Sequence, residues 1–442
     1  MAQAGPPRLN FAQAFRALKH RNYRLFFTGQ AISLIGTWVT RIATGWLVYR
    51  LTGSSFMLGL VSFLSMAPTF MVTPLGGIVA DRLSRHRVLL ITQAVLMVSS
   101  LGLAYFALRG TITVTHVIVL GMMQGLCNAF DIPARQAFVV EMVEGRDDLS
   151  SAIALNSTIF NSARLIGPSI AGVLIALFGE GLCFLIDGVS FIAVIAALAA
   201  MRVTPRPPRA QGKHVLHELR EGLGAAFGFE PIRAILLLMA LMSLVGMPYA
   251  VLMPVFADQV FHGAAMTLGA LMAAAGVGAL LGALSLAMRE SVLGLGRVVA
   301  GGGMLFGAAL IVFGLSKTLW VSLPVLVVLG YAMMVQMAAS NTIVQTIVDD
   351  DKRGRVMGFF AMAFMGTMPV GSLVGGELAR RIGAPATVML GGSLCILGGA
   401  LFGRMLPRLR TIVRPIYAAR GILPPLPEGV GSAAGLVPQD SD

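Results

Sequence analysis

The chain has 442 residues, of which 56% are hydrophobic and 12% are charged, and its mean hydropathy is +0.82. Soluble domains carry about 25% charged residues, so this composition excludes a soluble globular domain and indicates a protein that crosses the membrane several times. The formal net charge of +13 would suit a polyanionic partner such as nucleic acid, and the positions of the basic residues decide whether one is needed.

Twelve segments are long and apolar enough to cross a bilayer, which takes roughly 20 residues of helix. We predict spans at 25–49, 56–80, 88–108, 114–139, 151–178, 181–201, 233–257, 265–288, 297–316, 319–347, 354–379 and 384–405. A basic, proline-rich break divides them into six and six. The predicted fold class is an all-α membrane protein with an N-terminal arm (1–24), a six-helix bundle (25–201), a cytoplasmic linker (202–232), a second six-helix bundle (233–405) and a largely disordered tail (406–442).

The basic residues are distributed unevenly between the two sides of the predicted bundles. If both termini are cytoplasmic, five basic residues lie outside and three lie within helices, which leaves 25 of the 33 on the cytoplasmic side. The five outer residues are Arg50, Arg109, Lys317, Arg380 and Arg381. Because lysine and arginine are retained on the cytoplasmic side, the sequence predicts cytoplasmic termini, and its charge requires no nucleic-acid ligand.

The first helix offers Gln30, Ser33 and Thr37 as polar candidates for lining a substrate cavity. After the second span, the stretch "GGIVADRLSRHRVLL" at 76–90 concentrates charge. Gly77 and Asp81 are one helical turn apart, so the missing side chain allows close helix approach beside the carboxylate.

Asp81 and Arg85 are also one turn apart, in the acid-first order that stabilises a helix. With Gly77, Arg82 and Arg87, they resemble the loop motif between helices 2 and 3 of the major facilitator superfamily. The resemblance implies that Asp81 is a gating residue at the start of helix 11, stabilised there by the helix dipole. A simple basic helix end would explain the arginines but not the glycine and the aspartate.

The fourth span carries a polar stripe made of Gln124, Asn128, Asp131 and Arg135. A charge in hydrocarbon costs at least ~2.5 kcal/mol, so this stripe requires a reason. Asp131 and Arg135 are one turn apart and could form a structural ion pair, or Asp131 could exchange Arg135 for a proton during transport. Both interpretations remain open.

Three other ionisable residues, Arg41, Arg164 and Asp187, lie within predicted spans of the first half. Because the second half has no counterpart, we expect the chemistry of proton coupling in the first half. The candidates are Asp131, Arg135, Arg164, Arg41 and Asp187, and Asp187 is the rival proton site because it lies nearer the outer face.

The fifth span contains "NSARLIGPSIAG" at 161–172, in which Gly167 and Gly172 belong to a stripe of small residues and Pro168 removes a backbone hydrogen bond. Helix packing alone would account for such a stripe. It also resembles the Gly-Pro motif of antiporters in the same superfamily, which implies an exporter whose outer half closes at this helix.

Several longer stretches narrow the resemblance. "WVTRIATGWLVYRLTGS", "NSARLIGP" and "FLIDGVSF" are similar to the transmembrane secretion effector branch, which includes enterobactin and macrolide exporters. The similarity covers helices 1 to 6 well and helices 7 to 12 in outline. Gly121 stands where drug antiporters carry a proton-linked arginine, and Ser84 stands where the loop motif usually has glycine.

The two halves are related by a weak internal repeat. At an offset of 204 residues, "GPSIAGVLIALFG" at 167–179 lies over "GSLVGGELARRIG" at 371–383, and three glycines coincide. A neighbouring offset places Asp131 over Gln336 and Arg135 over Ser340. Repeats of this kind are how secondary transporters achieve alternating access.

The second half is apolar and rich in methionine, with 17 of the 26 methionines. Methionine adapts to irregular ligands, so these side chains suit a cavity for bulky compounds, although ordinary helix packing would also use them. The cavity candidates of this half are Tyr249, Met334, Met337, Asn341, Gln345 and Met365.

The sequence thus predicts a monomeric exporter in the bacterial inner membrane that moves hydrophobic or amphipathic small molecules, exchanges protons and contacts lipids. No Walker pattern or other catalytic motif occurs, so we expect no enzyme activity, cofactor or metal. The alternatives are a lipid or lysolipid flippase of the same fold and a non-transporting membrane sensor.

Overall fold

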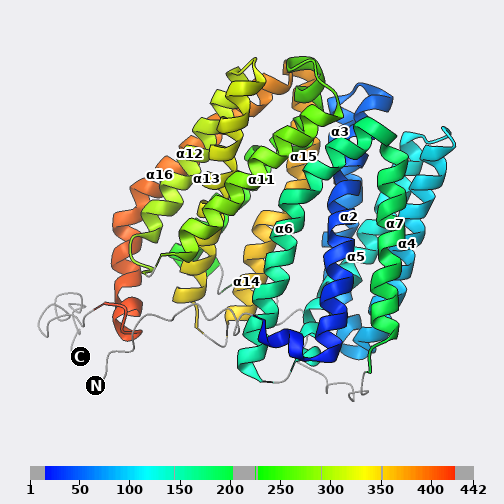
Figure 1. Cartoon of the computed structure of the whole chain (residues 1–442). Helices are drawn as coiled ribbons and strands as arrows, with labels where there is room; N and C mark the ends of the chain where they lie inside the picture. Colours follow the sequence, from blue (N-terminus) through cyan, green and yellow to red (C-terminus); the bar gives the residue numbers. More distant parts are fainter. Residues whose placement is uncertain are drawn as a thin grey trace, which may run out of the picture.

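The computed structural model describes residues 15–143, 145–202, 224, 227–289, 291–349 and 352–423. Within these ranges every regular element is a helix (Figure 1). Twelve helices are long and apolar enough to cross a membrane, as predicted. Most of the predicted linker and residues 424–442 of the predicted tail lie outside the described residues.

The first half begins with a short 3-10 turn, η1 (Arg16–Lys19), and continues with six long helices. These are α2 (Arg21–Thr52), α3 (Ser55–Arg82), α4 (Arg85–Leu108), α5 (Val114–Met142), α6 (Arg146–Phe178) and α7 (Glu180–Ala199). Polar caps set two of the starts, because the Ser54 and Thr113 hydroxyls accept hydrogen bonds from the first free amides of α3 and α5.

The second half has six spans, two of which are interrupted. The seventh span comprises α9 (Glu230–Leu241), η2 (Met242–Gly246), α10 (Pro248–Val255) and η3 (Phe256–Val260). The eleventh span is also interrupted and comprises α14 (Arg353–Ala361), η4 (Met362–Gly366) and α15 (Met368–Ile382). The four uninterrupted spans are α11 (Ala265–Ala287), α12 (Leu295–Leu315), α13 (Leu319–Ile347) and α16 (Ala384–Ala419).

Wide π-helical turns cause these interruptions. Both η2 and η4 precede a helix with a proline in its first turn, Pro248 in α10 and Pro369 in α15. Proline has no N–H to donate to the preceding turn, and a wide turn absorbs the irregularity. The predicted spans at 233–257 and 354–379 are therefore each interrupted by a π-helical turn.

The last helix continues to Ala419 and does not end at 405 as the sequence suggested. Pro407 and Pro415 lie inside it. An ion pair of 3.0 Å between Arg408 and Glu230 ties the extension to the start of α9, and Leu409 is buried. This tertiary contact stabilises helical residues that composition alone assigns to a tail.

The two halves form two bundles that converge at one end (Figure 1). We call this the far end, and the opposite end, where α2 begins and α16 ends, the terminal end. Near the far end α3 packs against α15, and α6 packs against α11. The hydroxyl of Tyr49 in α2 donates a hydrogen bond of 2.9 Å to Asp258 in η3. The bundles are thus joined near the far end and diverge toward the terminal end.

Repeated glycines make the corresponding turns of the two halves alike. Gly179, between α6 and α7, has φ +78°, and Gly383, between α15 and α16, has φ +85°. Residues with a Cβ rarely adopt this backbone conformation, whereas glycine adopts it at no steric cost. The coincidence seen at the sequence offset of 204 residues therefore reflects an equivalent turn in space.

Candidate functional site

Asp131 is fully buried in the middle of the first bundle. One carboxylate oxygen accepts hydrogen bonds from Thr92 Oγ1 (2.9 Å) and Gln93 Nε2 (2.8 Å) on α4, and the other pairs with the guanidinium of Arg135. Arg135 also donates a 2.7 Å hydrogen bond to Gln30 on α2. The ion pair expected from the spacing is present, and neutral side chains on two other helices complete it: Thr92 and Gln93 on α4 donate to Asp131, and Gln30 on α2 accepts from Arg135.

A second buried carboxyl group, Asp187 on α7, lies in a different environment. It is 2% exposed, and one oxygen accepts a 2.7 Å hydrogen bond from Ser100 on α4. Gln124 on α5 donates to the same hydroxyl at 3.3 Å. The other oxygen, Oδ1, has no hydrogen bond of good geometry with a described residue, but the hydroxyls of Thr40 and Thr37 on α2 are close enough to act on this carboxyl group.

A glycine makes room for this carboxyl group. A Cβ built on Gly36 of α2 would lie 2.9 Å from Oδ1 of Asp187 and 3.0 Å from Ser190 Oγ. Real Cβ atoms essentially never come so close, so a larger residue at position 36 would require the Asp187 side chain or α7 to shift. The packing of α2 against α7 therefore fixes Asp187 inside the first bundle.

The predicted stripe on α5 thus faces its own bundle over most of its length. Gln124, Asp131 and Arg135 contact α4 or α2, and Asn128 between them is half-buried. Gln124 and Gln30, which the sequence predicts to line a cavity, use their amides in hydrogen bonds with Ser100 and Arg135. On α2, Ser33 is buried, and the Thr37 hydroxyl donates to the Ser33 carbonyl at 3.0 Å.

Arg41 on α2 and Arg164 on α6 have no acidic partner among the described residues. Arg41 is exposed, and its guanidinium carbon lies 5.3 Å from the centroid of the Trp38 ring. Arg164 is partly buried and lies within electrostatic range of Arg41 and of Tyr249. These two cations differ from Arg135, whose charge is matched within the bundle.

The small residues of α6 contact two helices, one in each bundle. A Cβ on Gly167 would lie 2.5 Å from Cβ of Trp38 on α2, and a Cβ on Gly172 would lie 2.9 Å from Cα of Gly269 on α11. Pro168 is buried between them, and its carbonyl oxygen lies 3.0 Å from where a Cβ on Gly269 would be. The stripe is therefore a protein contact near the far end.

The loop motif after α3 is described only in part. The side chains of Asp81 and Arg82 lie outside the described residues. Among the described residues a Cβ on Gly77 would meet nothing within 4 Å, so the close helix approach expected at Gly77 is not found there; the tight contact is at the neighbouring Gly76, against the backbone of Ala129 on α5. Arg85 forms a 2.6 Å ion pair with Glu141 on α5.

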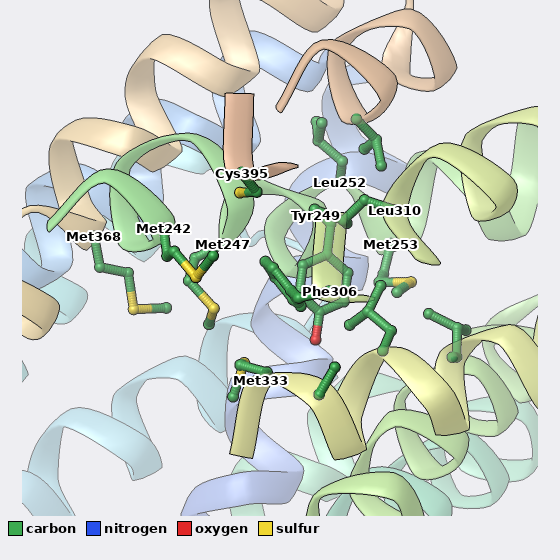
Figure 2. Close-up of a cluster of buried hydrophobic side chains, with 14 of the residues drawn as sticks. Met242, Met247, Tyr249, Leu252, Met253, Phe306, Leu310, Met333, Met368 and Cys395 are labelled. Carbon is green, nitrogen blue, oxygen red and sulfur yellow. The ribbon is translucent and has the colours of Figure 1, made fainter. Parts of the chain in front are cut away.

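Six of the 17 methionines of the second half are buried, and most of these lie in one packed core around Tyr249. Figure 2 shows Tyr249 and Phe306 surrounded by methionines from several helices. The rings of Tyr249 and Phe306 meet edge to face at 6.2 Å, and Tyr249 is 5% exposed. Met333 and Met368 are buried as well. Packing thus accounts for this part of the methionine-rich half.

The other predicted cavity residues do not share one site with Tyr249. Met334 and Met337 on α13 are partly buried, and Met365 in η4 is exposed. Asn341 and Gln345 are joined by a 2.5 Å hydrogen bond and line a pocket of about 480 Å³ near the terminal end of α13. That pocket is also lined by Thr342, Thr346, Arg353, Arg420 and Ile422.

The sequence interpretation missed the polar residues of α4 and the Tyr49–Asp258 contact. Thr92, Gln93 and Ser100 are neutral residues in an apolar span, and nothing in their spacing shows which neighbour they face. In the described parts of the chain, no three His, Cys, Asp or Glu side chains come together in a way that would hold a metal ion.

Solved structures with the same arrangement of helices are transporters. A bacterial homologue of the human lysosomal transporter Spinster, in an inward-facing and unoccupied conformation, aligns with a TM-score of 0.69 over 87% of this chain and 96% of its own, at 14% identity. A mutant of the nucleoside transporter NupG aligns with a TM-score of 0.67 over 88% of this chain and 99% of its own, at 14% identity. At these identities the likeness shows the fold alone, which is the expected arrangement of twelve helices in two six-helix bundles.

Relatives in sequence are also transporters. The Staphyloferrin A transporter of Staphylococcus aureus is 26% identical over 84% of this chain and 94% of its own length. The enterobactin exporter EntS of Citrobacter koseri is 25% identical over 93% and 96%, and the multidrug efflux pump Tap of Mycolicibacterium fortuitum is 27% identical over 85% and 93%.

A family model described as transmembrane secretion effector matches residues 12–414. The match includes both bundles, whereas the resemblance in the sequence was clear only for the first. The chain is therefore a multi-pass membrane transporter that belongs to the transmembrane secretion effector family of the major facilitator superfamily.

Proposed function

We propose that this chain is a secondary-active exporter of hydrophobic or amphipathic small molecules and that proton antiport drives it. The relatives named above include an enterobactin exporter and a multidrug efflux pump, which supports export of compounds of this kind. The two bundles would rock about their mutual contacts and expose a central path to one side of the membrane at a time.

The environment of Asp187 carries the proposal of proton coupling. This carboxyl group is 2% exposed and forms no ion pair with a described residue, and its polar neighbours are the neutral hydroxyls of Ser100, Thr40 and Thr37. A charge so placed is costly, so the group would hold a proton while the site is closed and release it when rearrangement admits water. Asp131, which Arg135 neutralises, is better suited to a structural role.

The direction of access follows from the same orientation that the basic residues predict. With both termini cytoplasmic, the terminal end faces the cytoplasm and the far end faces outward. The far end, where Tyr49 and Asp258 join the bundles, is then the closed outer side, and the transporter is open toward the cytoplasm, from which an exporter takes its substrate. In the opposite, outward-open state, Asp81 would help to close the terminal end.

A reconstitution experiment tests the proposal. Purified protein in liposomes with an internal pH indicator is exposed to a panel of siderophores, macrolides and amphipathic dyes, and we expect at least one to cause proton movement opposite to its own. Asp187→Asn should still catalyse exchange of that compound at equal pH but should lose accumulation driven by a pH gradient. Asp349→Asn, at an exposed acid on the terminal side, is the matched control.

Two results would contradict the proposal. Absence of substrate-dependent proton movement across the whole panel, with folded protein in the liposomes, would reject proton antiport. Full gradient-driven accumulation by Asp187→Asn would reject Asp187 as the proton carrier and return the role to Asp131.

A further inference from the structure

Arg41 and Arg164 are two positive charges without a counter-charge among the described residues of the first bundle. Neither guanidinium has a hydrogen bond or an ion pair with any described residue. The guanidinium carbon of Arg41 lies over the ring of Trp38, 5.3 Å from its centroid. The charges are close enough to act on each other. Unmatched charges in membrane helices are rare and mark functional sites.

Arg41 is exposed, but it lies on the face of α2 that is turned toward other helices. It lies on the face of α2 that also carries Gln30 and Gly45, since Gln30 and Gly45 are 11 and 4 residues from Arg41, separations close to whole numbers of helical turns. Gln30 contacts Arg135 on α5, and a Cβ on Gly45 would lie 3.9 Å from Pro254 on α10. This face therefore looks at helices of both bundles and not at lipid.

Arg164 points toward the same region from α6. One turn before it, Phe160 packs edge to face on Trp38 at 5.9 Å, and one turn after it, the carbonyl of Pro168 approaches Gly269 on α11. Arg164 is thus flanked by contacts with α2 on one side and with the second bundle on the other. Gly167 and Trp38 are in contact and so lie at the same level of the bundle. From that level, Arg164 lies about one helical turn toward the terminal end and Arg41 about one turn toward the far end.

None of the buried acids of the described residues forms an ion pair with these arginines. Asp131 pairs with Arg135, and Asp187 accepts from Ser100 inside the bundle. Asp258 accepts from Tyr49, which lies about 12 Å farther along α2 than Arg41. Two like charges at short range repel each other, and the described residues supply no negative charge that would neutralise this pair.

We propose that Arg41 and Arg164 bind the anionic group of the transported molecule, a carboxylate or a phosphate, while Trp38 covers the apolar part next to it. This inference rests on the proposed function and narrows its substrate class to amphipathic anions. Arginine suits the role because its planar group donates two parallel hydrogen bonds to a carboxylate or phosphate. A water-soluble compound and a lipid headgroup present the same chemistry.

Binding to matched probes tests the inference. The full-length protein is placed in nanodiscs of neutral phosphatidylcholine, and affinities are measured for 1-pyrenebutyrate against its methyl ester and for oleoyl lysophosphatidic acid against monooleoylglycerol. We expect the anion of at least one pair to bind about tenfold more tightly than its neutral partner, as a charge-assisted contact would give. If only oleoyl lysophosphatidic acid is preferred over its neutral partner, the anionic group that the arginines bind is a lipid headgroup.

Substitutions then assign the preference to the two arginines. Arg41→Gln and Arg164→Gln should each reduce it to less than about twofold, Arg164→Lys should retain part of it, and Arg109→Gln, at an exposed arginine near the far end, should leave it unchanged. Because each glutamine removes one of two repelling charges, the melting temperature should stay equal or rise.

The inference is overturned if neither anion is preferred or if the preference survives both glutamine substitutions. It is also overturned if both glutamine variants and Arg41→Lys lower the melting temperature, which would indicate that the arginines serve packing. Proton-coupled transport without an anion preference rejects this inference alone, whereas an anion preference without any transport rejects the proposed function.

Discussion

Gly172 of α6 and Gly269 of α11 face each other across the boundary between the bundles, and a Cβ on either would lie within 2.9 Å of the Cα of the other. Two helix backbones touch here with no side chain between them. At the equivalent boundary between α3 and α15, Gly59 faces Gly376, and a Cβ built on Gly376 would lie 3.0 Å from the Cα of Gly59. Small residues allow such approach in membranes.

Gly172→Leu should prevent the far end from closing. The added side chain would collide with the α11 backbone, and overpacking of this kind costs typically about 1 to 3 kcal/mol. We expect loss of gradient-driven export and increased labelling of a cysteine introduced near position 259. Gly301→Leu is the control, because a Cβ on Gly301 meets nothing within 4 Å. Normal export by Gly172→Leu would show that this contact is dispensable.

Tyr49→Phe should weaken closure of the far end more gently. It removes the hydrogen bond to Asp258 between the bundles, and such a bond contributes about 1 kcal/mol net, which corresponds to roughly a fivefold change in the ratio of closed to open molecules. Distances between spin labels on the two bundles measure that ratio. Tyr105→Phe, an exposed tyrosine on α4, should not change it, and equal distributions for both variants would count against the hydrogen bond.

Asp131→Asn should destabilise the first bundle. The substitution leaves Arg135 without its counter-ion in the membrane interior, and breaking a buried pair typically costs about 3 to 5 kcal/mol. Arg135 retains some exposure, so we expect the lower part of this range. The double variant Asp131→Asn with Arg135→Gln should recover most of the lost stability, measured by thermal unfolding in detergent. If the single variant is as stable as the parent chain, the pair has no structural role.

Asp81→Asn should favour the state that is open at the terminal end. The resemblance of residues 76–90 to the superfamily loop motif implies that Asp81 stabilises the closed terminal side against the start of helix 11. Removing the charge should increase labelling of cysteines on the terminal side and reduce export, with expression near normal. Arg87→Gln serves as a comparison within the same loop. Unchanged labelling with full export would reject the gating role.

Much of the fold could be predicted because hydropathy reports it directly. The spans, the division into six and six and the repeat around Gly172 and Gly376 follow from composition and spacing. The wide turn at Met242–Gly246 did not, although the nearby Pro248 was a signal. The extension of α16 depends on the Arg408–Glu230 ion pair, which joins residues far apart in sequence and which no local pattern records.

The candidate site could be predicted less well for a related reason. The one-turn spacing of Asp131 and Arg135 is visible in the sequence, because both residues lie on one helix. Their partners Thr92 and Gln93 lie on another helix, and the rotation of that helix is decided by packing. The same holds for Asp187, whose environment depends on Gly36 and Ser100 from two further helices.

The two glycine contacts, Gly172 with Gly269 and Gly59 with Gly376, have a consequence for how the chain tolerates change. Each joins the fifth helix of one half to the second helix of the other half, so an internal two-fold axis relates them. A bulky residue acquired at only one contact would tilt one bundle against the other, because the second contact would still close fully. Accepted substitutions at one contact should therefore require compensation at the other, so that the duplicated halves continue to evolve as a matched pair.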